Sequence, residues 1–175
     1  MADPPRPVFE ELDFRETELG DLILRRRTIL ALNNREIHEV ILGDAFLMSS
    51  LFTTVEIALA DLGLAAAESA FPGKKLEVVV GGLGLGYTAR ATLENPHVTT
   101  LNVVDFLKPV IEWHEQGLVP LGPELSSDPR CRFVQADFFS LEFDPDSPDR
   151  TFHAVLLDID HSPANLLHER LAEFY

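Results

Sequence analysis

The sequence predicts an α/β protein in which a small antiparallel β unit precedes a sheet of parallel strands that alternate with helices. Short apolar runs rich in β-branched residues recur in the second part of the chain, and segments with helical periodicity separate them. A glycine-rich turn follows the first of these runs directly. We place the boundary so that the N-terminal unit covers residues 1–52 and the larger domain covers residues 53–175.

The first 52 residues show the pattern of antiparallel strands joined by tight turns. Residues 1–8 hold three prolines and predict a loose tail. Turn signals follow at Glu18-Leu19-Gly20-Asp21 and at Gly43-Asp44. The expected strands are residues 9–17, 22–30, 37–42 and 45–49. The three arginines at 25–27 cannot form one basic patch, because a strand sends alternate side chains to opposite faces.

Helix and strand signals alternate from residue 53 onward. Thr53 and Glu56 form a capping box at the start of a helix that ends near Gly73. The expected strands are residues 76–80, 99–104, 131–136 and 152–157, and further helices are expected from Tyr87, around Val110 and from Ser162. Sheets of this type usually continue beyond a fourth strand. We therefore expect either a piece of a longer protein, truncated after the fourth core strand, or a partner chain covering that edge.

Composition and charge narrow the classes of partner. Hydrophobic residues make up 46% and charged residues 25% of the 175 residues, which is typical of globular protein, and the net charge is −15. Faces that bind nucleic acids or anionic membranes need clustered Lys and Arg, so this acidity argues against both partners. No apolar run approaches the ~18–20 residues of a membrane helix. The single cysteine, Cys131, excludes an intramolecular disulfide and a Cys-based zinc site, and it predicts a cytoplasmic protein.

The glycine-rich turn is the first candidate for ligand binding. Gly81, Gly82, Gly84 and Gly86 lie between a predicted strand and a predicted helix, where the backbone can approach a ligand closely and N–H groups can donate. The spacing Gly82-x-Gly84-x-Gly86 matches the loop of S-adenosylmethionine-dependent methyltransferases. The spacing Gly84-x-Gly86-x-x-Ala89 also passes for a dinucleotide fingerprint. The glycines alone leave both ligand classes open.

An acidic residue follows each of the three later strands. Asp105 can accept hydrogen bonds from both hydroxyls of a ribose. Asp137 can accept one from an adenine amino group, with Phe138 packing on the ring. Asp158 and Asp160 form an acid pair at the carboxyl end of the fourth strand, and two neighbouring acids raise a pKa in a way that suits a base. We expect Asp158 to take a proton from the acceptor, supported by Asp160.

An alternative for the acid pair is a divalent metal held with His161. No third ligand with recognisable spacing accompanies Asp158, Asp160 and His161, so no metal is expected. The other five histidines show no partner pattern and are expected to lie on the surface or in the packing.

Five segments occur in a characteristic order and spacing, namely Glu16–Leu24, Val80–Gly86, Val104-Asp105 with Val110–Glu112, Ala136–Phe138 and Leu156–Pro163. With these segments the chain resembles the spermidine synthase (polyamine aminopropyltransferase) family, whose catalytic domain has the class I methyltransferase fold, a Rossmann-like parallel sheet. The resemblance implies that the glycine turn holds the nucleoside, that Asp105 binds its ribose and Asp137 its adenine, and that Asp158 lies next to the transferred group. It also implies a possible homodimer, formed through the N-terminal region.

Three places depart from the family's pattern. The family's loop is Gly-Gly-Gly-Asp-Gly-Gly, in which the aspartate contacts the aminopropyl ammonium, and Gly84 holds that place here. The family's Tyr-His-Glu stretch near the polyamine corresponds to a region that keeps only Glu56. The family's Asp-Thr-Asp-Pro run corresponds to Asp158-Ile159-Asp160-His161. Compared with the family, this chain therefore lacks several groups that recognise a diamine, whereas it keeps those of the nucleoside site.

We therefore expect a spermidine synthase-like transferase that uses S-adenosylmethionine, with methyl transfer to a small and cationic acceptor favoured over aminopropyl transfer. One alternative is aminopropyl transfer from decarboxylated S-adenosylmethionine to putrescine. An alternative of another class is a non-catalytic module that binds a nucleoside or serves as a dimerisation surface. A nicotinamide-dependent dehydrogenase is a weaker alternative, because no Tyr-Lys or His-Asp pattern accompanies the loop.

Overall fold

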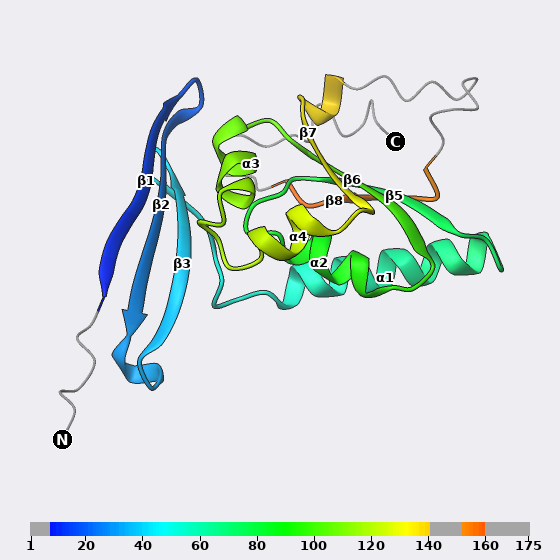
Figure 1. Cartoon of the computed structure of the whole chain (residues 1–175), viewed down its shortest axis with the longest axis horizontal. Helices are drawn as coiled ribbons and strands as arrows, with labels where there is room; N and C mark the ends of the chain where they lie inside the picture. The colour runs from blue at the N-terminus through cyan, green and yellow to red at the C-terminus, as the bar shows by residue number, and fades with distance from the viewer. Residues whose placement is uncertain (1–7, 141–151, 160–175) are drawn as a thin grey trace. The chain divides into compact units, whose positions relative to one another are not determined.

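A computed structural model describes residues 8–140 and 152–159 of the chain. The chain divides into two units, Met1–Thr53 and Thr54–Tyr175. Figure 1 shows the strands of the first unit and the mixed helices and strands of the second. The predicted α/β fold class, with a small antiparallel β unit before a parallel sheet, is confirmed.

The first unit is a four-stranded antiparallel sheet in which the strands follow one another in chain order. The strands are β1 (Phe9–Thr17), β2 (Gly20–Ile29), β3 (Arg35–Leu42) and β4 (Ala45–Ser49). A short 3-10 turn, η1 (Leu30–Leu32), joins β2 to β3. Asn33 and Asn34 follow it with positive φ, a conformation that asparagine tolerates better than most residues. The predicted hairpins are therefore present, with β2 starting two residues earlier than expected.

The three consecutive arginines of β2 are divided between the two faces of this sheet, as predicted. Arg25 and Arg27 both bind the carboxylate of Glu39, through Nε–Oε distances of 2.6 and 2.9 Å. Arg26 lies on the opposite face and binds Glu10 through Nη2. Each arginine therefore has an acidic partner, which fits a structural role in the sheet.

The second unit alternates helices with parallel strands. In chain order its elements are α1 (Thr54–Ala70), β5 (Leu76–Gly81), α2 (Tyr87–Glu94), β6 (Val98–Asp105), α3 (Lys108–Glu115), α4 (Gly122–Ser127), β7 (Cys131–Gln135), the 3-10 turn η2 (Phe138–Ser140) and β8 (Ala154–Leu157). Helix α4 was not predicted, because its six residues include a glycine, a proline and two serines and show no apolar period. The helix expected from Ser162 lies outside the described residues.

The order of strands in the parallel sheet is β7-β6-β5-β8. The chain therefore adds β6 and β7 on one side of β5 and then places β8 on the other side. Ligands in open α/β sheets bind in the crevice outside the carboxyl ends of the strands, at such a reversal of strand order. The glycine turn follows β5 directly, so it lies at this position.

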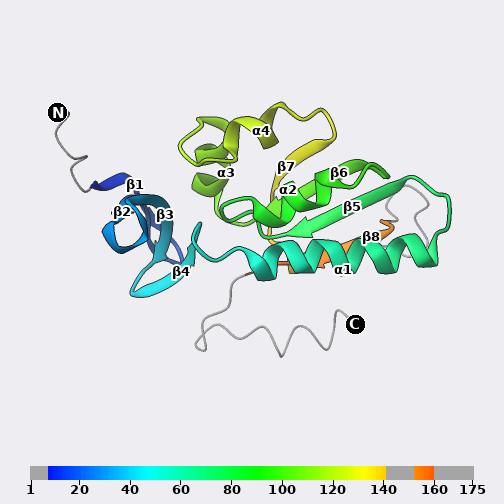
Figure 2. The ribbon, with the colours of Figure 1, turned by 90° about the horizontal axis from the view of Figure 1, so that it is seen from below.

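Side chains on both faces of β5 are buried. Val78 and Val80 point to one face and Val79 to the other, as alternation in a strand requires. Helix α1 lies along β8 (Figure 2). Gly63 allows this close packing, because a Cβ atom there would collide with the side chain of Leu156. Among the described residues, no helix is both long enough and apolar enough to cross a membrane.

Candidate functional site

The glycine turn is bound to the strands on both sides of β5. The N–H of Gly82 donates to the carbonyl of Val104 at the end of β6, at 2.8 Å. On the other side, a Cβ atom at Gly82 would collide with the carbonyl of Asp158, just beyond β8. Gly82 also has a φ of 96°, a conformation that side chains rarely adopt. This position therefore requires glycine for two independent reasons, and the turn is fixed between the ends of β6 and β8.

Asp105 lies at the end of β6 and holds the turn through its carboxylate. Its Oδ2 accepts a hydrogen bond from the N–H of Leu83 at 2.9 Å, and its Oδ1 accepts one from Leu107 at 2.8 Å. Burial raises the pKa of Asp105, whereas the hydrogen bonds from the backbone of Leu83, Leu107 and Gly84 lower it in part. A carboxylate has about four acceptor sites, so most of them are already used. Binding of a ribose hydroxyl by Asp105 stays a prediction, with less free capacity than the sequence suggested.

The sequence suggested that the backbone N–H groups of the glycine turn are free to bind a ligand, but three of them donate to acceptors within the protein. Gly82 donates to Val104, Gly86 donates to the carbonyl of Leu83 at 2.8 Å, and Leu83 itself donates to Asp105. Phosphate-binding turns instead present such N–H groups to the anion. These three amides therefore already have acceptors within the protein and are not available to a phosphate.

Asp158 follows β8 and is half-buried. Its backbone N–H donates to the carbonyl of Gly81 at 2.7 Å, which fixes it beside the glycine turn. Its Oδ2 accepts a hydrogen bond from the hydroxyl of Thr88 at 2.5 Å. Burial raises the pKa of Asp158 above its usual range, and the Thr88 hydrogen bond opposes this in part. Asp160, the predicted second member of the acid pair, lies outside the described residues.

Thr88 was not singled out from the sequence. It lies in the first turn of α2, two residues after Gly86, and its side chain is 2% exposed. The available signal was a hydroxyl residue at the start of a helix that follows a glycine turn. Such a residue is common for reasons of helix geometry alone, so only the folded chain pairs it with Asp158.

His114 supports the turn from within the protein. It is fully buried in α3, and its Nδ1 lies 3.0 Å from the carbonyl of Val110. Its Nε2 would lie 3.0 Å from a Cβ atom at Gly86. The imidazole therefore fills the space beside the last glycine of the turn, which agrees with the packing role expected for the histidines. Burial lowers the pKa of His114, so the neutral ring is favoured.

Asp137 and Phe138 follow β7 at the edge of the site. The carboxylate of Asp137 accepts hydrogen bonds from the N–H of Phe139 at 3.0 Å and from the hydroxyl of Ser140 at 2.6 Å, so it stabilises the turn η2. The ring of Phe138 is 3% exposed and packs with Val79 and Val104. Contacts of Asp137 and Phe138 with an adenine ring stay predictions, and both residues already have structural roles.

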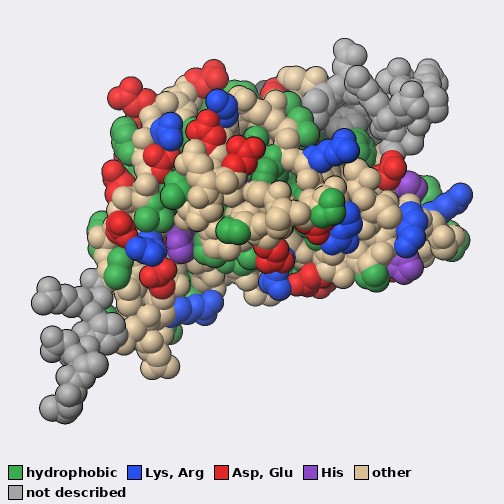
Figure 3. Space-filling view, in the orientation of Figure 1, with side chains coloured by type: hydrophobic (Ala, Val, Ile, Leu, Met, Phe, Trp, Pro, Cys, Tyr) green, Lys and Arg blue, Asp and Glu red, His purple; other side chains and the backbone are tan. Residues whose placement is uncertain are grey.

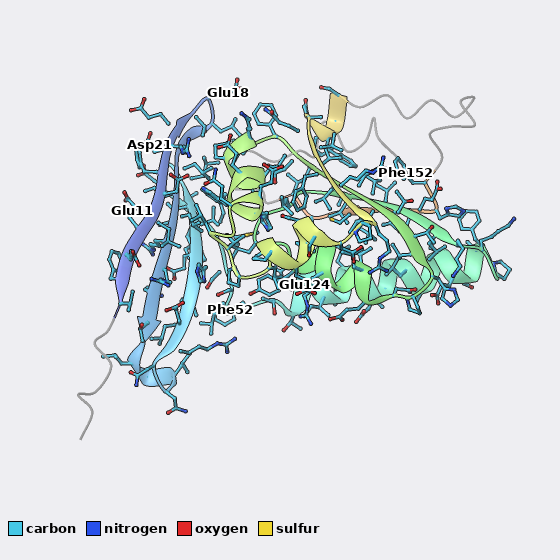
Figure 4. All side chains as sticks on the ribbon, in the orientation of Figure 1. Glu11, Glu18, Asp21, Phe52, Glu124 and Phe152 are labelled. Carbon is cyan, nitrogen blue, oxygen red and sulfur yellow. The ribbon has the colours of Figure 1, made fainter. Side chains whose placement is uncertain are left out.

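Arg90 forms ion pairs with acidic side chains on its own helix and on α4. Arg90 on α2 lies 2.7 Å from Glu94 and 3.7 Å from Glu124, which projects from α4 (Figure 4). On the face shown in Figure 3, acidic and basic side chains are interspersed. Within residues 8–140 and 152–159, no cluster of three His, Cys, Asp or Glu side chains could hold a metal ion.

Comparison with known proteins identifies the fold. No family model matches the chain. Among solved structures, spermidine synthase from Thermotoga maritima aligns with a TM-score of 0.65 at 17% identity, over 90% of this chain and 49% of the other. A spermidine synthase in complex with the transition-state analogue AdoDATO aligns with a TM-score of 0.66 at 15% identity, over 92% of this chain and 50% of the other. The resemblance expected from the sequence is thus confirmed for the fold, and the chain spans about half the length of these structures.

Proposed function

We propose that this chain carries the nucleoside-binding part of a transferase that moves an aminopropyl group from decarboxylated S-adenosylmethionine to a small cationic amine such as putrescine. The observation that carries the proposal is the arrangement at the reversal of the parallel sheet. Asp105 beside the glycine turn offers a nucleoside site, and Asp158 offers a carboxyl group beside the same turn. The two solved structures aligned above are spermidine synthases, which supports aminopropyl transfer more than the methyl transfer favoured by the glycine spacing.

The electrostatics of the site support a sulfonium compound as the donor. The carboxyl groups of Asp105 and Asp158 lie at the two sides of the turn, and the chain as a whole carries a net charge of −15. A negative field attracts a sulfonium and a protonated amine and repels a pyrophosphate. The same field therefore favours a cationic donor and a cationic acceptor.

The reaction would be an in-line displacement at the carbon beside the sulfonium. The amine nitrogen of the acceptor forms a bond to this carbon, the carbon–sulfur bond breaks, and the sulfur leaves as a neutral thioether. Asp158 takes the proton that the amine loses. The main contributions of the protein are alignment of the two substrates and this proton transfer. A carboxyl group whose pKa is raised by burial suits the role of base better than an ordinary surface aspartate.

Methyl transfer is the second candidate, and Gly84 is the observation that favours it. In the spermidine synthase family an aspartate at this place contacts the aminopropyl ammonium. Here Gly84 has a φ of 49° and no side chain with which to make that contact. A donor that keeps its carboxylate would meet no repulsion from this position.

Calorimetric titration with four ligands tests the proposal, namely decarboxylated S-adenosylmethionine, S-adenosylmethionine, methylthioadenosine and NAD. We expect the decarboxylated compound to bind most tightly, and the mass of the product formed with putrescine to show an added aminopropyl group. Asp105→Asn should weaken nucleoside binding by roughly tenfold or more, because the donors of the turn lose a charged acceptor. Glu94→Gln, on the exposed end of α2, is the matched control and should bind as the wild type does.

Each other outcome contradicts the proposal in its own way. Tighter binding of S-adenosylmethionine would establish the methyl-transfer alternative. Tighter binding of NAD would contradict the argument from the inward-pointing amides. If folded protein binds none of the four, the chain is a non-catalytic module instead.

A further inference from the structure

The hydroxyl of Thr88 lies between two oxygen atoms that come from different elements. Asp158 Oδ2 is 2.5 Å away, and the backbone carbonyl of Glu56, in the first turn of α1, is 3.4 Å away. Thr88 itself is 2% exposed, so water has little access to its hydroxyl. Among the described residues of α2, Thr88 is therefore the one that donates a hydrogen bond to the carboxylate of Asp158.

A hydroxyl has one proton to donate and can also accept hydrogen bonds. When Asp158 is ionised, Thr88 donates its proton to Oδ2. When Asp158 is protonated, its own O–H can donate to Thr88, and the Thr88 proton can turn toward the carbonyl of Glu56. The same short contact is thus kept in both protonation states, and the heavy atoms need not move.

We infer that Thr88 is a positioning residue that holds the Asp158 carboxyl group in one place before and after it takes a proton from the acceptor. This inference rests on the proposed function of Asp158 as the base. Thr88 affects the reaction through Asp158 and not through contact with a substrate. Since proton transfer depends on the geometry of the base, loss of the hydroxyl should affect turnover more than nucleoside binding.

Among residues 8–140 and 152–159, Thr88 is the residue whose side chain donates to the carboxyl group of Asp158. The glycine turn presents the backbone of Gly82 to the carbonyl of Asp158, and α1 presents the carbonyl of Glu56 toward Thr88. Among the described residues, burial and the Thr88 hydrogen bond are the two influences on the pKa of Asp158, and no charged side chain contributes. Without the hydroxyl, burial raises the pKa of Asp158 with no opposing hydrogen bond from Thr88.

The test compares Thr88→Val with Thr88→Ser in the full chain. Valine keeps the shape of threonine without the hydroxyl, and serine keeps the hydroxyl without the methyl group. Thr92→Val is the matched control, because Thr92 is equally buried on the same helix but donates to the carbonyl of Thr88 at 2.8 Å. The carboxyl carbon of Asp158, assigned by comparison with Asp158→Asn, is titrated by carbon-13 NMR in each protein.

We expect Thr88→Val to raise the pKa of Asp158, and Thr88→Ser and Thr92→Val to leave it near the wild-type value. With substrates, kcat of Thr88→Val should fall by roughly tenfold while KM for the nucleoside changes little, and the acid limb of its pH profile should move to higher pH. An unchanged titration of Asp158 in Thr88→Val would overturn the inference. A shift in Thr88→Ser as well would also overturn it, because the methyl group would then be the cause.

The titration needs no substrate, so it separates this inference from the proposed function. If the titration moves as expected but no sulfonium nucleoside binds, the proposed function fails and the link between Thr88 and Asp158 stands. If the nucleosides bind and turn over while the titration does not move, the inference on Thr88 fails alone.

Discussion

Glu39 in the antiparallel sheet and Asp158 in the parallel sheet are both withdrawn from solvent, but their partners differ in kind. Glu39 is 2% exposed and binds two guanidinium groups, those of Arg25 and Arg27. Asp158 is half-buried and binds the neutral hydroxyl of Thr88. The first carboxylate therefore has its charge compensated by two cations, whereas no cationic side chain within residues 8–140 and 152–159 compensates the second.

The pKa values of the two groups move in opposite directions for this reason. Burial raises the pKa of Glu39, but the hydrogen bonds and charges of Arg27 and Arg25 outweigh it and lower the pKa overall. Burial dominates at Asp158 and raises its pKa. A compensated carboxylate suits a structural ion pair, and an uncompensated one is better suited to exchange a proton. Four predictions test this comparison.

The largest effect is expected for Asp158→Asn. Loss of a general base should lower kcat by a factor of about 10²–10⁴, while the midpoint of thermal unfolding stays the same or rises, because a poorly compensated buried charge is removed. Turnover assays and thermal denaturation on the same sample measure both quantities. Full turnover in this variant would show that Asp158 is not the base.

Glu39→Gln should lower stability and leave kcat unchanged, which is the opposite of the result expected for Asp158→Asn. Its effect in free energy should be smaller. We expect the free energy of unfolding to fall by about 2 kcal/mol, because two arginines lose a charged hydrogen-bond acceptor that they share. Urea denaturation measures this change. Glu36→Gln is the matched control on the same strand, where the side chain is 46% exposed, and it should change stability by less than about 0.5 kcal/mol. Equal losses in both variants would contradict the distinction between buried and exposed pairs.

The contributions of Glu39 and Asp158 to stability should depend on pH in opposite directions. The stabilisation from Glu39 is present above its unfolded-state pKa and is lost as the pH falls through its lowered folded-state pKa. The contribution of Asp158 is present below its unfolded-state pKa and is lost as the pH rises through its raised folded-state pKa. As the pH falls from about 7 to about 3, the stability advantage of the wild type over Glu39→Gln should shrink. Over the same fall in pH, the stability of the wild type relative to Asp158→Asn should increase. Thermal unfolding of the three proteins across this range measures both trends, and parallel trends would refute the assignment.

The smallest effect is expected for Arg90→Gln. Arg90 is 41% exposed and pairs with Glu94 one turn along α2, and such exposed pairs contribute about 0.5 kcal/mol or less. Chemical denaturation should therefore detect little change. A loss as large as that of Glu39→Gln would mean that burial does not explain the difference between the two kinds of pair.

The elements with strong local signals were the ones that could be predicted. Strand β1 matches its expected bounds and helix α2 begins at the expected residue, because a strand pattern and a glycine turn are visible in a few consecutive residues. Helix α4 was missed because its sequence has no apolar period. The site followed the same rule in part. Asp105 and Asp158 were found because each directly follows an apolar strand, whereas Thr88 carried no signal that pointed to a distant carboxylate.

By itself, the sequence determined the order of strands and helices, the place of the glycine turn and the acidic residues that end the strands, since these depend on residues close together in the chain. The tertiary structure decided which of these groups meet. It put β8 beside β5, which brings Asp158 within a hydrogen bond of Thr88, 70 residues earlier in the chain. It also turned the carboxylate of Asp105 toward the amides of the turn. Burial and hydrogen-bond geometry are set by packing between elements, and no local pattern contains them.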